Sequence, residues 1–241
     1  MLTASEEIEL AKEIDNSIPE AKEKFINAIN SDTILVSVMA VNNETGIIQP
    51  IKLVSNIISK SGSPALFHCD AVQAFGKVNL KPQKLGVDLM SISSHKIHGP
   101  KGVGALYIRK GARIVPLHYG GEQERKIRPG TESLPLICAF AEAVKALPNI
   151  DDQHEKIEEL WNYCKEKVLE IPNVYINSPD GVLPYILNIS AVGVRSETML
   201  HYLAESGIYV SSGSACAKGK KSHVLTAMGL SPERIDSAIR I

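Results

Sequence analysis

The spacing of apolar positions changes repeatedly along the chain between the alternating period of strands and the longer period of helices. Runs rich in β-branched and other apolar residues predict strands at residues 33–41, 65–70, 87–93 and 104–109. Helical spacing of Glu, Lys, Ala and Ile predicts a helix at residues 5–30, and stretches with proline near their start or after their end predict helices at 50–61 and 135–147. Strands that alternate with helices favour an α/β fold with a mostly parallel, doubly wound sheet.

The pattern changes after residue 147, where a charged stretch at 151–170 predicts a helix with one solvated face. Beyond it we expect strands near 185–190 and 208–211 and a helix at 196–206. The sequence therefore predicts two domains: a large domain over residues 1–147 and a smaller C-terminal α/β domain over 148–241.

Composition narrows the classes of function. The chain has 241 residues, 44% of them hydrophobic, and a formal net charge of −1, which is typical of a globular protein with a sizeable core. No apolar run is long enough to span a bilayer, and the first residues lack the pattern of a signal peptide, so we expect a cytoplasmic protein without a membrane partner. The balanced charge argues against direct binding of nucleic acid. Four widely spaced cysteines without a Cys-x-x-Cys pair give little support to disulfides or to a metal site.

Two residues follow predicted strands in a way that indicates chemistry. Lys96 comes after the strand at 87–93 and before a glycine-rich turn, and Asp70 closes the strand at 65–70. Open α/β sheets bind ligands at the carboxyl ends of their strands. A partly desolvated lysine can form a Schiff base with an aldehyde, and a carboxylate can pair with a protonated pyridine nitrogen, so together they suggest pyridoxal phosphate. Taken singly, a lysine at this place is usually a solvated rim residue, and an aspartate is a turn or helix cap about as often as a ligand.

Cys216 lies in a loop of small residues and lysines, Ser211 to Ser222, that follows the predicted strand at 208–211. Nearby cations favour the reactive thiolate, and an exposed loop is suited to carrying a nucleophile between two positions. The alternative is a buried cysteine that fills space. The other cysteines lie in apolar or helical patterns and are expected to be structural: Cys69, Cys138 and Cys164.

Five segments, in this order, resemble the motifs of cysteine desulfurases of the NifS/IscS type, which belong to the class V aminotransferase branch of fold-type I pyridoxal phosphate enzymes. They are Val41-Asn42-Asn43-Glu44-Thr45-Gly46, His68-Cys69-Asp70-Ala71-Val72-Gln73, Ser93-Ser94-His95-Lys96, Arg128-Pro129-Gly130-Thr131 and Ser212-Gly213-Ser214-Ala215-Cys216. The resemblance runs from about Ala28 to Ile241. Because five motifs occur in the family's order, the probability of a chance match is very small.

The resemblance implies a role for each matching residue. Lys96 would hold the cofactor and move the α-proton, Asp70 would pair with the pyridine nitrogen, and Gln73 would bond the ring hydroxyl. Ser93 and His95 would bind the phosphate, and Thr131 would reach the phosphate in the neighbouring subunit of a homodimer. Asn43 would contact both cofactor and substrate, and with Arg240 it would hold the substrate carboxylate, for which a forked guanidinium is well shaped. Each of these residues also has an ordinary explanation as a turn, cap, packing or ion-pair residue.

The implied reaction is removal of sulfur from L-cysteine, giving L-alanine and a persulfide on Cys216. An iron-sulfur scaffold or a tRNA-thiolation protein would then accept the sulfur. Compared with the family, the chain is expected to be truncated in its large domain, without the glycine-rich phosphate cup, and at the end of its small domain. Loss of that cup predicts weak cofactor binding and impaired activity. The alternatives are a selenocysteine lyase or other class V aminotransferase-like enzyme, and a non-catalytic fragment or interaction module.

Overall fold

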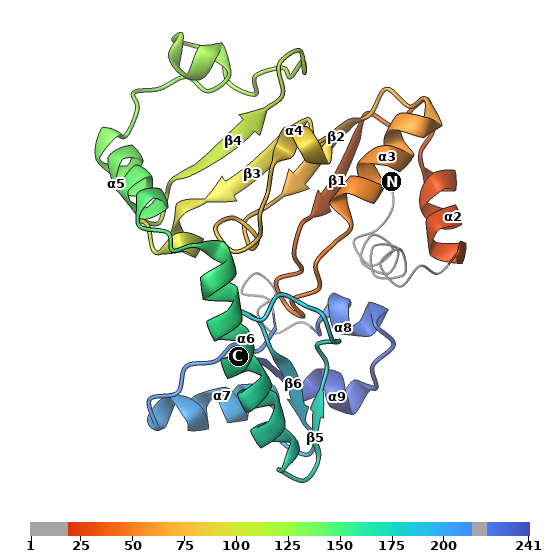
Figure 1. Cartoon of the computed structure of the whole chain (residues 1–241), viewed down its shortest axis with the longest axis vertical. Helices are drawn as coiled ribbons and strands as arrows, with labels where there is room; N and C mark the ends of the chain where they lie inside the picture. Colours follow the sequence, from red (N-terminus) through yellow and green to blue (C-terminus); the bar gives the residue numbers. More distant parts are fainter. Residues whose placement is uncertain (1–18, 214–220) are drawn as a thin grey trace. The chain divides into compact units, whose positions relative to one another are not determined.

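The computed structural model describes residues 19–213 and 221–241, and it divides into two compact units (Figure 1). The four-stranded unit comprises Ser31–Ser37 and Ile51–Ile150. The three-stranded unit comprises Val38–Pro50 and Asp151–Ile241, with the described chain up to Asn30. The predicted boundary after residue 147 has a counterpart close by, at 150/151, but residues 38–50 group with the C-terminal unit.

The four-stranded unit has the strand order β1-β2-β3-β4. Its strands are β1 (Leu35–Met39), β2 (Leu66–Asp70), β3 (Leu89–Ser93) and β4 (Gly104–Ile108). β2 and β3 pair in parallel, whereas β4 pairs antiparallel with β3, to which it is joined by the ten-residue connection 94–103 that includes one short 3-10 turn. The α/β fold is confirmed, with a mixed and mostly parallel sheet.

Helices cover this sheet as the apolar periodicity requires. α3 (Ile51–Ser61) buries Ile51, Val54, Ile57 and Ile58 and packs against β2. Phe67 and Cys69 are buried on one face of β2, while His68 and Asp70 point to the other face because strand residues alternate. α5 (Leu134–Lys145) buries Phe140 and contacts the short 3-10 turn η1 (Ser94–Ile97) that follows β3.

Three further short elements lie before residue 150 in the described part of the chain. They are α2 (Pro19–Ala28), α4 (Pro82–Leu85) and the 3-10 turn η2 (Gln123–Lys126). The predicted helix at 5–30 is thus observed at its C-terminal end, and its first residues lie outside the described part of the chain. η2 contains three successive non-glycine residues with positive φ, Glu124, Arg125 and Lys126.

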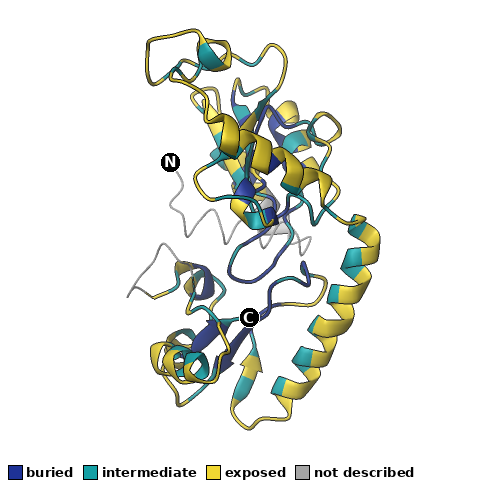
Figure 2. Cartoon of the chain, turned by 90° about the vertical axis from the view of Figure 1, so that its left-hand side faces the viewer, coloured by how far each residue is buried: buried dark blue, intermediate teal, exposed yellow. Residues whose placement is uncertain are grey.

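The three-stranded unit has the antiparallel strand order β5-β6-β7. Its strands are β5 (Val174–Ile176), β6 (Asn188–Ala191) and β7 (Ala238–Arg240), and its helices are α6 (Ile150–Leu169), α7 (Ser196–Glu205), α8 (His223–Ala227) and α9 (Pro232–Asp236). Leu187, Ile189 and Ile239 form the core, and α6 and α7 pack apolar residues against it. Figure 2 shows the buried sheet and the exposed outer face of α6, as the charged pattern at 151–170 predicts.

The prediction of a strand at 208–211 is wrong. In this segment only Ser211 makes a bridge, to Arg240, and Tyr209 is 85% exposed. Its run of β-branched and aromatic residues, Ile208 to Val210, is typical of a strand, but the neighbouring strand β7 is only three residues long and ends at Arg240. The pairing therefore extends over one position.

Candidate functional site

The carboxyl ends of β2 and β3 lie side by side and carry the first group of candidate residues. In the parallel register Asp70 is opposite Ser91, and the Ala71 amide donates to the Ser91 carbonyl over 2.9 Å. The Asp70 side chain is exposed, and its Oδ1 accepts a hydrogen bond from the Val72 amide at 2.9 Å. Asp70 thus stands at the end of β2, on the sheet face that also carries Ser91 and Ser93.

Lys96 lies in η1, directly after the end of β3. Its side chain is half-buried, and the Oγ of Ser93 and the Nδ1 of His95 are 2.7 Å apart just before it. A Cβ at Gly99 would come within 2.0 Å of the Ser94 Oγ, so only glycine permits this close return of the chain. The Ser94 Oγ is itself buried and has no hydrogen-bond partner. The turn that carries Lys96 is therefore tightly packed between Ser94 and Gly99.

The segment after Asp70 forms two helical turns, in which the amides of Phe75 and Val78 donate to the carbonyls of Ala71 and Ala74. Gln73 lies on this segment, half-buried, three residues after Asp70. Lys77 lies four residues further on and so shares one face with Gln73. Burial, and then the positive charge of Lys96, lowers the pKa of Lys77. The two amines are therefore electrostatic neighbours.

Lys77 was not among the residues singled out from the sequence. The signal that could have found it is the helical spacing of Asp70, Gln73 and Lys77. Its backbone is also fixed: a Cβ at the preceding Gly76 would meet Ile97 and Leu147 at 3.1 and 2.9 Å. Position 77 is thus held against the turn that carries Lys96.

Thr131 is exposed on the loop between η2 and α5, in the four-stranded unit. Its loop is organised by Gln123, whose Oε1 accepts a hydrogen bond from the Gly130 amide at 3.2 Å. The structure shows Thr131 at the surface of its own chain, which is compatible with a contact to a second subunit.

Asn43 and Arg240 meet in the three-stranded unit although they are 197 residues apart in the sequence. The Arg240 Nη1 donates to the Asn43 backbone carbonyl over 2.7 Å, and both side chains are half-buried. Arg240 closes β7, and its backbone exchanges hydrogen bonds of 2.6 and 3.0 Å with Ser211. Two residues that the resemblance assigns to one task are therefore in contact.

The cysteines differ in their surroundings. Cys216 lies outside the described residues. Cys69 is fully buried on β2, and burial, with the negative charge of Asp70, raises its pKa to about 12. A thiol with so high a pKa is an inert structural residue, as expected. Cys138 is exposed on α5, and Cys164 is partly buried against the core of the three-stranded unit.

The donor set of the four-stranded unit fits pyridoxal phosphate. One half-buried primary amine, one carboxylate on the neighbouring strand end, one amide side chain and a serine-histidine pair are the groups that an aldehyde, a pyridinium nitrogen, a phenolic oxygen and a phosphate require. Within the described ranges there is no cluster of His, Cys, Asp or Glu that could hold a metal ion.

Comparisons with known proteins identify the family of the chain. The family described as "Aminotransferase class-V" matches residues 7–241. The match begins earlier than the expected start near Ala28. The chain therefore belongs to the class V aminotransferase family, whose members depend on pyridoxal phosphate.

Within this family the chain is similar to cysteine desulfurases. It is 43% identical over 219 residues to "Cysteine desulfurase IscS" of Methanosarcina thermophila, covering 89% of this chain and 54% of the relative. It is 41% identical over 232 residues to "Cysteine desulfurase, mitochondrial" of Saccharomyces cerevisiae, covering 94% and 46%. A solved structure named "NIFS-LIKE PROTEIN" superposes with a TM-score of 0.84 at 40% identity, covering 91% of this chain and 58% of that one.

The chain spans about half the length of the curated relatives that it matches. No helix in the described part of the chain is long and apolar enough to cross a membrane. Relatives include a protein named as mitochondrial, so the expected cytoplasmic location stays a prediction.

Proposed function

We propose that this chain carries the chemistry of a pyridoxal phosphate-dependent cysteine desulfurase, which removes sulfur from L-cysteine and leaves L-alanine and a persulfide on Cys216. One observation carries the proposal: Asp70 and Lys96 follow the carboxyl ends of two neighbouring parallel strands, in a register fixed by the pairing of Asp70 with Ser91. The similarity to cysteine desulfurases supports the choice of L-cysteine as substrate.

Each candidate residue has a part in this chemistry. Pyridoxal phosphate, when bound, supplies an electron sink that makes the α-proton acidic and weakens the carbon-sulfur bond. Lys96 would hold the cofactor through its aldehyde group and would move the α-proton of the substrate, and Asp70 would keep the pyridine nitrogen protonated. Gln73 would contact the ring hydroxyl, and Ser93 and His95 would bind the phosphate.

Asn43 and Arg240 hold the substrate carboxylate, for which their direct contact prepares them. The Cys216 thiolate attacks the substrate sulfur, so that a sulfur-sulfur bond forms as the carbon-sulfur bond breaks and the carbon takes a proton. L-cysteine and the thiol thus give L-alanine and the persulfide without an external oxidant or reductant.

The persulfide would pass to a sulfur-acceptor protein for iron-sulfur cluster or thio-cofactor biosynthesis, and the active form would be a homodimer. The exposure of Thr131 supports the homodimer, because a residue that reaches a neighbouring subunit must lie at the surface of its own. Size-exclusion chromatography with light scattering tests the dimer, and an elution as a monomer at micromolar concentration would contradict it.

The central test mixes the purified chain with pyridoxal phosphate and borohydride. We expect a reduced adduct on Lys96, found by peptide mass spectrometry, and its loss in Lys96→Ala. With L-cysteine and excess cofactor, the unreduced protein should form L-alanine and a persulfide on Cys216 at a low rate, since we expect cofactor binding to be weak, and Cys216→Ala should form neither from L-cysteine. Alanine formation from selenocysteine alone would instead favour a selenocysteine lyase. Labelling of surface lysines without preference for Lys96 would contradict the proposal and favour a non-catalytic interaction module.

A further inference from the structure

Glu44 is a buried carboxylate in the three-stranded unit, only 1% exposed, in the loop that follows β1. The Ser222 hydroxyl donates to its Oε2 over 2.5 Å, although the two residues are 178 positions apart. The same Ser222 oxygen accepts the Leu225 amide at 3.1 Å and so caps α8. Burial of a carboxylate is unfavourable unless it is hydrogen-bonded, so this contact must be maintained for the loop to keep its place.

The backbone of Glu44 is fixed from two further sides. Its amide donates to the Asn42 Oδ1 at 2.9 Å, and its carbonyl accepts from the Asn188 Nδ2 at 3.1 Å. Asn188 is the strand partner of Arg240 in the β6–β7 pairing. The preceding residue is Asn43, whose backbone carbonyl accepts a hydrogen bond of 2.7 Å from the Arg240 guanidinium. Glu44, Asn188, Arg240 and Asn43 thus form a closed ring of contacts.

We propose that Glu44 is a positioning residue. It holds the Asn43 backbone carbonyl in place, and this carbonyl in turn fixes the Arg240 guanidinium. The fixed guanidinium is then oriented to bind the α-carboxylate of an amino-acid substrate. This inference rests on the proposed function for the identity of the substrate, but not for the effect of Glu44 on Arg240. Its physical basis is that a guanidinium with one nitrogen already bonded loses less freedom when it binds a carboxylate. The side chain of Glu44 does this indirectly, through its clamp on Ser222.

The first experiment measures the reactivity of individual arginines in the full chain, without cofactor. Phenylglyoxal labels guanidinium groups, and peptide mass spectrometry gives the labelling rate of each. The variants are Glu44→Ala, Ser222→Ala and Glu44→Gln, the last of which keeps an oxygen that can accept the Ser222 hydroxyl. Arg234 is the internal control, because it lies in the same unit and is held by the Ile176 carbonyl at 2.8 Å and the Asn177 Oδ1 at 2.5 Å.

We expect Arg240 to be labelled about two- to tenfold faster in Glu44→Ala and in Ser222→Ala, the range that loss of one restraining hydrogen bond gives. Labelling of Arg234 should stay unchanged, and Glu44→Gln should behave as the parent chain. Unchanged labelling of Arg240 would overturn the proposal. A parallel rise at Arg234 and Arg240 in both alanine variants would overturn it too, because Glu44 would then support the whole unit rather than the pair. If Glu44→Ala does not fold, Ser222→Ala decides.

A second measurement separates this inference from the proposed function. If the protein forms L-alanine from L-cysteine, Glu44→Ala should raise KM by a similar factor while kcat stays within about twofold, since an interaction used for substrate binding has been weakened. A fall in kcat at unchanged KM would contradict positioning of the carboxylate pair. If the parent chain forms no alanine, the proposed function fails, and the labelling of Arg240 still decides the role of Glu44.

Discussion

Asp88 ties together three strands of the four-stranded unit, and its replacement tests how firmly they are held. Its Oδ2 accepts the Phe67 amide at 2.8 Å, and its Oδ1 accepts the Arg109 Nε at 2.5 Å. Phe67 is 1% exposed, so Asp88→Ala leaves a buried amide without a partner, which costs about 1–3 kcal/mol. The Arg109 side chain is 48% exposed, so its ion pair adds at most about 1 kcal/mol. We expect Asp88→Ala to lower the free energy of unfolding by about 1–4 kcal/mol.

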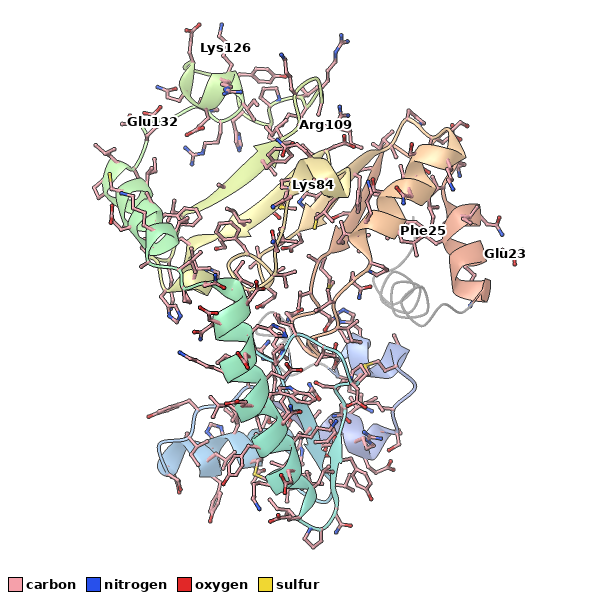
Figure 3. The ribbon with its side chains drawn as sticks, in the orientation of Figure 1. Glu23, Phe25, Lys84, Arg109, Lys126 and Glu132 are labelled. Carbon is pink, nitrogen blue, oxygen red and sulfur yellow. The ribbon has the colours of Figure 1, made fainter. Side chains whose placement is uncertain are left out.

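Two matched variants divide this loss into its parts. Asp88→Asn keeps an oxygen for the Phe67 amide, and Arg109→Ala removes only the partner at the end of β4 (Figure 3), so each should cost about 1 kcal/mol. Urea unfolding followed by far-UV circular dichroism gives the free energies. The only tryptophan, Trp161, lies in the other unit, so its fluorescence serves as a control whose midpoint should not change. The reasoning is refuted if Asp88→Ala costs under about 0.5 kcal/mol, or if Asp88→Asn costs as much as Asp88→Ala.

Three further predictions concern residues around the candidate site. Burial raises the pKa of Cys69 from 9.0 to about 12, so above pH 9 the thiol ionises in the unfolded chain before it does in the folded one. The free energy of unfolding should therefore fall by about 1.4 kcal/mol per pH unit above pH 9. Urea unfolding at pH 8–10 measures this slope, and Cys69→Ala should flatten it. Burial lowers the pKa of His68 below 6.5, so the unfolded state takes up a proton first and stability is lost as the pH falls below 6.5. His68→Gln should reduce the difference between the free energies of unfolding at pH 7 and pH 5. An unchanged difference would contradict this cause. Gly99→Ala brings a methyl group onto the Ser94 Oγ and should lower the yield of borohydride-fixed cofactor on Lys96 without lowering general lysine labelling; addition of Ser94→Ala should restore part of it.

Much of the four-stranded unit could be predicted from the sequence because its elements have strong local signals. α3 begins at Ile51 directly after a proline, as predicted, and the end of β2 at Asp70 was found to the residue. Parallel strands bring their carboxyl ends to one edge, so the placement of Asp70 and Lys96 at the ends of neighbouring strands followed from their order in the chain. The homologous motifs pointed to the same residues.

The rest of the candidate site depends on contacts between distant parts of the chain. β7 is three residues long and exists because Asn188 and its neighbours pair with it, so no periodicity could have revealed it. The clamp of Ser222 on Glu44 joins two loops, and only the folded chain shows it. Local pattern therefore identified the residues near strand ends and missed those that hold other residues in place.

The two ends of the β2–β3 pair are linked through register. Asp88 fixes Phe67 at the first end, and from there the pairing runs through His68 with Leu89 to Asp70 with Ser91 at the other. A slip of one residue would move Asp70 to the opposite face of the sheet, because strand side chains alternate. Ser93 and Lys96 follow β3 directly and would lose their neighbour. The hydrogen bonds of Asp88 are therefore needed to place Asp70 and Lys96 at the other end of the strand pair. A variant that weakens them should lose borohydride fixation of the cofactor on Lys96 at urea concentrations where Trp161 fluorescence still shows a folded three-stranded unit.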